Sequence, residues 1–377
     1  MKELNIGSIL TARRRAKGVT QDEVAEYAGV SKASVSKWEN GLSYPDITIL
    51  PLLATYFNIS IDELLGYHPQ LSDKEIQKKY REFSGAFAEQ PFLKVMDEVR
   101  EFIRKYDSCY PLLFSMAQLY LNNFMLASSM EEGIMILDEA KALCRRIQQE
   151  CEDTLLNKDA LAMEAFICMY KKEPEEILSL LGGKVRAVLP TEYLIISAYQ
   201  MLGENERAME YVQASMYQQL VIMMDYLGMY LSLCSDDNKE MGMKCIRKFA
   251  EAFSMDSLMP HKLVGFFCGE AIYYGNKRDE EKTIASLEDY VLLIERNLKN
   301  FSLHGDKFFD RLDQWLEESA LGYQMPRDMR LVLKDMTGAV TENPVFSFLE
   351  ENPRFQILKK RLATVQEKQK DCGGGKK

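Results

Sequence analysis

Helical periodicity extends along almost the whole chain, and this pattern restricts the fold more than any other feature of its 377 residues. Apolar residues recur every three to four positions, and short segments rich in Gly, Pro or Asn separate the periodic runs. Strand signals are nearly absent, because β-branched clusters are few and no hairpin dipeptide joins two alternating segments. The sequence therefore predicts an all-α protein.

Composition and charge limit the kind of protein this can be. Hydrophobic residues make up 47% and charged residues 28%, as in ordinary soluble globular proteins, and the length suggests two to three domains. The net charge of −10 argues against a chain that coats nucleic acid along its whole surface. Residues 1–65 contain seven Lys or Arg and eight Asp or Glu, so one small DNA-reading module remains compatible with this charge.

The first 65 residues contain the start and stop signals of five short helices. Thr20 and Glu23 have the spacing of a capping box, and Ser31 is placed to cap a third helix. Gly18 and Gly41 are placed to end the first and third helices. We therefore predict a five-helix domain over residues 1–65, followed by a linker over residues 66–72.

The third predicted helix has one polar and one apolar face. Val35 and Trp38 share the apolar side, which we expect in the core. The opposite face carries small and polar residues, which are Ala33, Ser36, Lys37 and Asn40. The major groove admits a helix whose leading face is unobstructed, and this face meets that requirement. Taken alone, however, Lys32 and Lys37 could equally belong to an ordinary solvated helix face.

Residues 9–65 resemble the helix-turn-helix domain of phage-repressor and Cro-type regulators, also called the xenobiotic-response-element (XRE) family. The resemblance is carried by Arg14, Thr20-Gln21, Val24-Ala25, Gly29-Val30-Ser31, Ser34, Ser36, Trp38-Glu39-Asn40-Gly41, Pro45, Leu50, Leu53-Ala54 and Asp62-Glu63-Leu64-Leu65. It implies a lambda-repressor-like fold and a transcriptional regulator that binds a double-stranded DNA operator.

The resemblance also implies roles for individual residues. The expected DNA contacts are Gln21, Ser31, Lys32, Ala33, Ser36, Lys37 and Asn40, with Gln21 and Asn40 on phosphates and the third helix on bases. Lys32 replaces the Gln often found in phage repressors, so no operator sequence carries over. Arg14 leaves the apolar face of the first helix, and the resemblance pairs it with Glu39 as a structural salt bridge.

Residues 73–365 resemble an array of tetratricopeptide-like helical hairpins. The best-defined unit extends from Tyr193 to Met216, where Tyr199, Gly203 and Ala208 have the spacing of that repeat. Asn352-Pro-Arg-Phe355, followed by Leu358 and Leu362, resembles the closing helix of such arrays. Residues 366–377 contain three consecutive glycines, and we expect a disordered tail there.

Helix-turn-helix domains joined to such bodies resemble bacterial regulators that sense short signalling peptides. Asn122 and Asn123 are the candidate ligand-binding residues, although a capped kink or a satisfied buried amide would also explain them. We expect a homodimer held by residues beyond 73, in the bacterial cytoplasm and associated with the nucleoid. The alternative is an interaction protein whose helical body docks a protein partner.

Other functions find little support in the sequence. No Gly-rich phosphate loop, nucleophile elbow or H-E-x-x-H motif occurs, so we expect no catalytic residues and no cofactor. The eight cysteines form no C-x-x-C pair and only three histidines occur, so we expect no metal site and free thiols typical of the cytoplasm. Residues 108–130 lack charge, but their Asn and Gln amides favour a buried helix over a membrane span.

Overall fold

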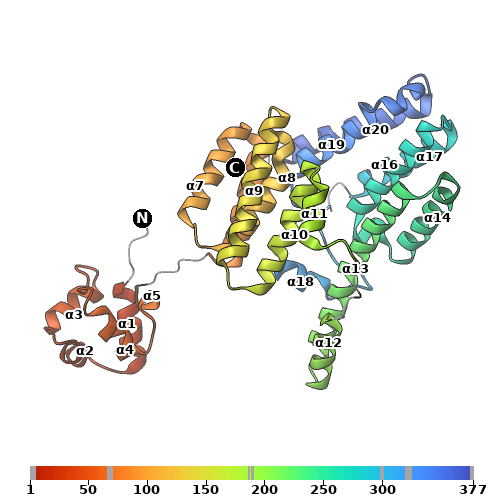
Figure 1. Cartoon of the computed structure of the whole chain (residues 1–377). Coiled ribbons are helices and arrows are strands. Elements are labelled where there is room, and N and C mark those ends of the chain that lie inside the picture. Colours follow the sequence, from red (N-terminus) through yellow and green to blue (C-terminus); the bar gives the residue numbers. More distant parts are fainter. Residues whose placement is uncertain are drawn as a thin grey trace. The chain divides into compact units, whose positions relative to one another are not determined.

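The computed structural model describes residues 6–65, 71–185, 187, 191–297, 301–318 and 325–373, with side chains up to Val365. Every regular element within these ranges is a helix, which confirms the predicted all-α class (Figure 1). The chain divides into two compact units. The N-terminal unit contains residues 1–72 together with 104–112, and the helical body contains residues 73–103 and 113–377.

Five short helices build the N-terminal unit: α1 (Ile6–Lys17), α2 (Gln21–Ala28), α3 (Lys32–Glu39), α4 (Leu50–Phe57) and α5 (Ile61–Leu65). Its core consists of apolar residues from all five helices, among them Leu10, Val24, Trp38, Leu53 and Leu64. The predicted linker falls largely on residues 66–70, which lie outside the described residues.

One glycine sets the distance between α1 and α3. A Cβ atom on Gly7 would lie 2.5 Å from the Trp38 carbonyl oxygen and 2.9 Å from that of Glu39. Both atoms belong to the backbone, so neither can rotate away. Gly7 therefore lets the first turn of α1 approach the end of α3 more closely than any other residue would allow.

The helical body continues with helices of varied length. They are α6 (Asp73–Glu89), α7 (Phe92–Lys105), α8 (Tyr110–Asn123), η1 (Phe124–Leu126), α9 (Met130–Glu150), α10 (Thr154–Lys171), α11 (Pro174–Leu181), α12 (Thr191–Met201), α13 (Asn205–Leu233), α14 (Asp236–Ala252), α15 (Met255–Leu258), α16 (Pro260–Asn276), α17 (Glu280–Asn297), α18 (Leu312–Glu318), α19 (Met329–Thr341), η2 (Pro344–Leu349) and α20 (Pro353–Gly373). Consecutive helices joined by short turns pack as hairpins, most extensively α9 with α10, α10 with α11, α12 with α13 and α16 with α17. Helix α19 also packs on α20, with η2 between them in the chain. This is the arrangement that the tetratricopeptide resemblance predicts.

The closing helix α20 lies where the sequence predicts it. Asn352 accepts the Arg354 amide at its start, and Phe355, Leu358 and Leu362 are buried against the C-terminal core of the body. The structure describes α20 through Gly373, whereas the sequence analysis expects a disordered tail from residue 366. Helical propensity of the Lys- and Gln-rich stretch extends the helix up to the consecutive glycines.

The uncharged segment over residues 108–130 forms α8 and η1, which belong to a folded core. Leu112, Leu113, Met116 and Tyr120 are almost completely buried. None of the helices described is long and apolar enough to cross a membrane. The seven cysteines that the structure describes are all free thiols, and Cys109, Cys144 and Cys168 are buried.

Candidate DNA-binding surface

Local hydrogen bonds set the start and end of α2 and the start of α3. The Thr20 hydroxyl accepts the Glu23 amide at 3.3 Å, while the Glu23 carboxylate accepts the Thr20 amide at 2.7 Å. Gly29 ends α2 with a φ of 68°, a conformation that costs glycine nothing. Ser31 then caps α3 by accepting the Ser34 amide at 3.2 Å. The capping signals in the sequence therefore position the turn between the two helices.

Helix α3 presents the polar face that the sequence predicts. Val35 and Trp38 are buried, with 1% and 5% of their surface exposed. Lys32, Ala33 and Lys37 are exposed on the other side. A rigid helix with an apolar inner face and a small, cationic outer face can enter a major groove without obstruction.

A buried ion pair connects α1 with the end of α3. Arg14 donates to both carboxylate oxygens of Glu39, at 2.6 and 3.0 Å, and also to the Val19 carbonyl at 3.1 Å. Only 6% of the Glu39 side chain and 17% of the Arg14 side chain are exposed. Burial alone would raise the pKa of Glu39, but the hydrogen bonds from Arg14 and Gln21 outweigh it and lower that pKa below 4.5.

Gln21 makes a hydrogen bond that the sequence does not predict. Its side-chain amide donates to the Glu39 carboxylate at 2.7 Å, so the residue expected on a phosphate also braces α2 against α3. One hydrogen of that amide and its carbonyl oxygen remain for a further contact. The sequence contained no signal for this bond, because it depends on how α2 and α3 cross.

Lys32, Lys37 and Asn40, which are also predicted to contact DNA, are exposed, so their present contacts can give way to DNA. Lys32 forms a 2.7 Å ion pair with Asp22, and more than 60% of each side chain is exposed, so the pair can be exchanged for DNA at small cost. Asn40 donates to the Ser36 carbonyl at 2.8 Å and caps the end of α3. Lys37 makes no ion pair within the described residues and is free to meet a base or a phosphate.

The two candidate ligand-binding asparagines serve the body's own structure. Asn122 donates to the Tyr80 hydroxyl at 3.0 Å, which in turn donates to the Pro326 carbonyl at 2.9 Å. Asn123 is 1% exposed and donates to the Leu119 carbonyl one turn earlier in α8. The Asn123 side-chain oxygen, however, is buried and has no hydrogen-bond partner among the described residues, so only the amide nitrogens of the two asparagines are seen to serve the fold.

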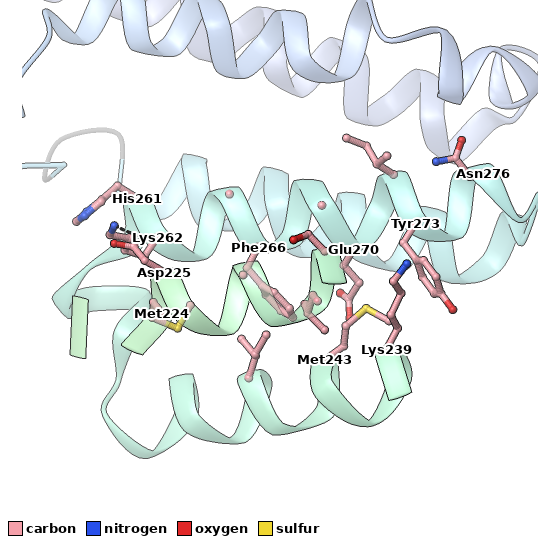
Figure 2. A pocket seen from close by; sticks show the side chains of 17 residues that line it. Met224, Asp225, Lys239, Met243, His261, Lys262, Phe266, Glu270, Tyr273 and Asn276 are labelled. Carbon is pink, nitrogen blue, oxygen red and sulfur yellow. Dashed lines mark hydrogen bonds and ion pairs between the residues drawn. The ribbon is translucent and has the colours of Figure 1, made fainter. Parts of the chain in front are cut away.

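A groove lies elsewhere in the body, between α13, α14 and α16, and has a volume of about 570 Å³. Figure 2 shows apolar side chains between these three helices, namely Met224, Met243 and Phe266. Polar groups flank them, with the Asp225–Lys262 ion pair and His261 at one end and Lys239, Tyr273 and Asn276 at the other. Such a mixture of an apolar floor and a few polar groups is typical of ligand sites.

Three glycines keep this groove open. No atom lies within 4 Å of the position that a Cβ would take on Gly228 of α13 or on Gly265 and Gly269 of α16. Glycine inside a helix costs about 1 kcal/mol relative to Ala, and here no close helix contact explains that cost. The two α16 glycines four residues apart are the sequence signal that could have located the groove.

His261 at the end of the groove is held in its neutral form. Burial, followed by the nearby Lys262 charge, lowers the pKa of His261 to about 4. Its Nδ1 atom is buried and has no hydrogen-bond partner among the described residues. A ligand that approached this end of the groove would meet an uncharged imidazole with an unused polar atom.

A partly buried cluster of side chains from α9, α10 and α11 surrounds the ammonium group of Lys141. Cys168, Glu173 and Glu176 place a thiol and two carboxylate oxygens within 4.8 Å of one another, as a metal site would require. Lys141 Nζ donates to Glu173 at 2.9 Å and to Glu176 at 2.8 Å, and only 8% of its side chain is exposed. The carboxylates already have their positive partner, so the cluster fits a lysine side chain better than a metal ion.

This cluster makes part of the body's stability depend on pH. Hydrogen bonds from Lys171 and Lys141 lower the pKa of Glu173 from 4.5 to about 2. A lowered carboxyl pKa stabilises the fold fully above pH 4.5, and the contribution is lost as the pH falls toward 2.

We expect Glu173→Gln to lower the free energy of unfolding by about 1 kcal/mol at neutral pH, since the carboxylate is partly exposed. The difference in stability between the variant and the unmodified protein should narrow in acid. Urea unfolding at about pH 7 and about pH 3 measures this difference. The exposed Glu152→Gln variant is the control, and an equal loss at both pH values would contradict the prediction.

Comparisons with known proteins agree on the N-terminal domain. Residues 10–64 match the sequence family described as Helix-turn-helix. The chain is 42% identical over 53 residues to the HTH-type transcriptional activator BcrR of Enterococcus faecalis, covering 14% of this chain and 26% of BcrR. It is 34% identical over 71 residues to the SPbeta prophage-derived uncharacterized HTH-type transcriptional regulator YonR of Bacillus subtilis, covering 19% of this chain and 66% of YonR. With antitoxin PezA of Streptococcus pneumoniae the identity is 30% over 70 residues, covering 19% of this chain and 44% of PezA.

Two solved structures match most of the chain at low similarity. PlcR of Bacillus thuringiensis, solved with a peptide and DNA, is 14% identical with a TM-score of 0.26, and the match covers 95% of this chain and 98% of PlcR. The apo form of ComR from S. thermophilus is 12% identical with a TM-score of 0.25, covering 78% of this chain and 94% of ComR.

Proposed function

We propose, from the premise that residues 10–64 form a helix-turn-helix domain, that this chain is a sequence-specific DNA-binding transcriptional regulator. The exposed face of α3, carried on a core that the Arg14–Glu39 pair braces, is the observation that supports this function. The partner is a double-stranded operator in the bacterial nucleoid, and the proposal assigns the chain no catalytic role.

In this proposal the start of α3 enters the major groove. Lys32 leaves Asp22 and donates to guanine O6 or N7, while the Ala33 methyl meets a thymine methyl. Ser36 and Lys37 contact bases or the adjacent backbone. Gln21, Ser31 and Asn40 lie at helix ends, where amide and hydroxyl groups meet phosphates and set the register of the domain on the duplex.

Alanine substitutions on α3 test whether this helix is the reading helix, that is, the helix that contacts the bases. Lys32→Ala or Lys37→Ala should weaken operator binding by about 1–3 kcal/mol if the lysine reads a base. A lysine that contacts only phosphate should instead weaken all sequences equally and reduce the salt slope by about one unit. Fluorescence anisotropy with operator and scrambled duplexes, over a range of salt concentrations, separates the two cases.

A matched control variant separates the loss of a lysine–DNA contact from the effect of removing one positive charge. Lys94 lies on α7 in the helical body and is 63% exposed, so Lys94→Ala removes one positive charge without touching α3. This variant should bind the operator as the unmodified protein does. If Lys32→Ala and Lys37→Ala both bind like this control, α3 is not the reading helix.

We further propose that the groove between α13, α14 and α16 binds a short peptide that presents a bulky apolar side chain. The open space beside Gly228, Gly265 and Gly269 supports this choice, because it accommodates a side chain that the protein itself does not supply. Its volume of about 570 Å³ lies within the range of ligand sites. The unused His261 nitrogen could bond the peptide backbone.

Filling the groove should abolish the response to such a peptide. The probe is a pool of synthetic heptapeptides that each carry one aromatic residue, and the readouts are the thermal midpoint and the operator affinity. Gly269→Leu should remove any shift that the pool produces in the unmodified protein. Gly85→Leu is the control, because Gly85 also has open space beside it but lies on α6, outside the groove. No shift in the unmodified protein, or an undiminished shift in Gly269→Leu, would contradict the peptide site.

A further inference from the structure

Helix α6 carries a row of exposed cations on the side that faces away from the core. Lys74, Lys78 and Arg81 follow one another at intervals of four and three residues, so they line one face of the helix, and all three are exposed. We call these three residues the α6 basic stripe. The buried side chains of α6 lie on the opposite face and include Ile76, Tyr80, Phe83 and Phe87.

The carboxylates of the protein do not neutralise the α6 basic stripe. None of its three cations makes an ion pair within the described residues. Glu82 and Glu89, which lie near the stripe on α6, are bonded to Lys79 and Arg330. The acidic residues at positions 73 and 75 lie about 100° around the helix on either side of Lys74. The stripe therefore offers three unpaired positive charges to a partner.

Packing fixes the direction in which the stripe points. Tyr80 is 3% exposed, and its hydroxyl accepts a hydrogen bond from Asn122 and donates one to the Pro326 carbonyl. These bonds and the apolar contacts beside them set the rotation of α6 about its axis, so the stripe on the opposite face stays exposed. A partner therefore meets cations that the fold already holds in a row.

The spacing and charge of the stripe suit the backbone of duplex DNA. The stripe extends over about 10 Å, since its ends are seven residues apart and a helix rises about 1.5 Å per residue. Duplex DNA carries one phosphate charge per about 1.7 Å of its axis, so about six phosphates lie within that length. Residues 66–377 carry a net charge of −9, which is the total of −10 less the −1 of residues 1–65, so the stripe gives this acidic body a place to approach a polyanion.

The connection to the N-terminal unit keeps the stripe close to a duplex that α3 holds. Residues 66–72 separate Leu65 at the end of α5 from Asp73 at the start of α6. A fully extended chain advances at most about 3.6 Å per residue, so α6 begins within about 29 Å of Leu65. One helical turn of DNA is about 34 Å long, so the stripe stays within about one turn of duplex from the N-terminal unit.

We infer that the α6 basic stripe is a second DNA contact, which binds phosphates of the same duplex within about one helical turn of the segment that α3 reads. This inference rests on the proposed function, since α3 must hold the duplex for the stripe to reach it. The stripe reads no bases. It adds affinity and salt dependence, and it fixes the position of the helical body relative to the bound DNA.

The salt dependence of binding tests the stripe. The probe is a duplex of about 40 base pairs that the unmodified full chain selects from a random-sequence library, which leaves room for two half-sites and their flanks. Each phosphate contact contributes about 0.9 to the slope of log affinity against log salt. The combined variant Lys74→Ala, Lys78→Ala and Arg81→Ala should therefore reduce the slope by about 2.7 for each bound chain. The affinity advantage of the unmodified protein should shrink about fortyfold between about 50 and about 200 mM salt.

A matched control removes the same charge elsewhere in the body. Lys158 on α10 and Lys244 and Lys248 on α14 are exposed, and none of them lies on α6. The combined variant Lys158→Ala, Lys244→Ala and Lys248→Ala also changes the net charge by −3, and its salt slope should equal that of the unmodified protein. Thermal midpoints of both variants check that each remains folded. Equal slopes for the stripe variant and this control would overturn the inference.

Ethylation interference locates the contact on the duplex. Phosphates at which ethylation blocks binding of the unmodified protein should form two groups, one beside the bases that α3 contacts and one within about one helical turn of them. The stripe variant should be insensitive to ethylation of the second group only. If the same phosphates interfere with both proteins, the stripe does not touch the DNA backbone.

The outcomes also separate this inference from the proposed function. A stripe variant that matches its control, while the selected duplex is still preferred over a scrambled one, would refute the stripe contact and leave the regulator proposal intact. A reduced salt slope together with equal binding to selected and scrambled duplexes would refute the sequence-specific regulator and leave the stripe contact intact. Stripe-dependent binding to phosphatidylserine vesicles, with duplex binding unchanged, would assign the stripe to a membrane surface and overturn the inference.

Discussion

Glu39→Ala is expected to destabilise the N-terminal unit by about 3–5 kcal/mol, the largest effect of any single substitution proposed for this chain. The Glu39 carboxylate accepts hydrogen bonds from Arg14 and Gln21 and is almost completely buried. Its removal leaves the partly buried Arg14 guanidinium with only the Val19 carbonyl, and leaves the Gln21 amide without its acceptor. An unpaired charge in a protected position is costly because no water replaces the lost partner.

The measurement needs a signal from the N-terminal unit alone. The chain has two tryptophans, and Trp38 lies in that unit while Trp315 lies in the body. In a Trp315→Phe background, the fluorescence of Trp38 during urea unfolding reports this unit. The difference in unfolding free energy between Glu39→Ala and its background should shrink in acid, because a lowered carboxyl pKa stabilises the fold fully above about pH 4.5 and this contribution is lost as the pH falls through the lowered pKa of Glu39.

A second Arg–Glu pair in the same unit provides the control. Arg13 bonds to Glu63, but more than 40% of each side chain is exposed. Glu63→Ala should therefore cost no more than about 1 kcal/mol. Similar losses for Glu39→Ala and Glu63→Ala would show that burial does not strengthen the Arg14–Glu39 pair.

Gly7→Ala is the second substitution with a large expected effect, although it adds only one methyl group. The new Cβ would meet the backbone carbonyl oxygens of Trp38 and Glu39 at 2.5 and 2.9 Å, so α1 and α3 would have to separate. We expect a loss of about 1–3 kcal/mol, even though Ala favours a helix over Gly by about 1 kcal/mol. Operator affinity should fall as well, because the end of α3, the proposed reading helix, would move.

The control for this variant is another helical glycine. Gly85 on α6 has no atom within 4 Å of its would-be Cβ, so Gly85→Ala should be neutral or stabilising by up to about 1 kcal/mol. Thermal unfolding of the whole protein compares the stability of the Gly7→Ala and Gly85→Ala variants, and Trp38 fluorescence reports the N-terminal unit that Gly7→Ala changes. A stabilised Gly7→Ala variant would contradict the close approach of α1 and α3.

Local signals let the sequence alone determine the secondary structure of the N-terminal unit and the orientation of α3. The Thr20 capping box, the Gly18 stop and the Ser31 cap each involve residues within four positions of one another, and helical periodicity alone assigns Trp38 to the core. The Arg14–Glu39 pair followed from the resemblance to a known domain. The end of α20 was less predictable, since Gln366 and the residues after it favour helix but lack a strong stop signal until the glycines.

Only the tertiary structure decided the features that depend on which faces of distant helices meet. Gln21 bonds Glu39 because α2 crosses α3, and Gly7 is restricted because α1 approaches the end of α3. The groove exists because glycines on α13 and α16 face a shared space, and Asn122 is occupied because α6 brings Tyr80 to it. Periodicity predicts that a helix has an apolar face. Which helix packs against that face depends on packing between segments far apart in the chain.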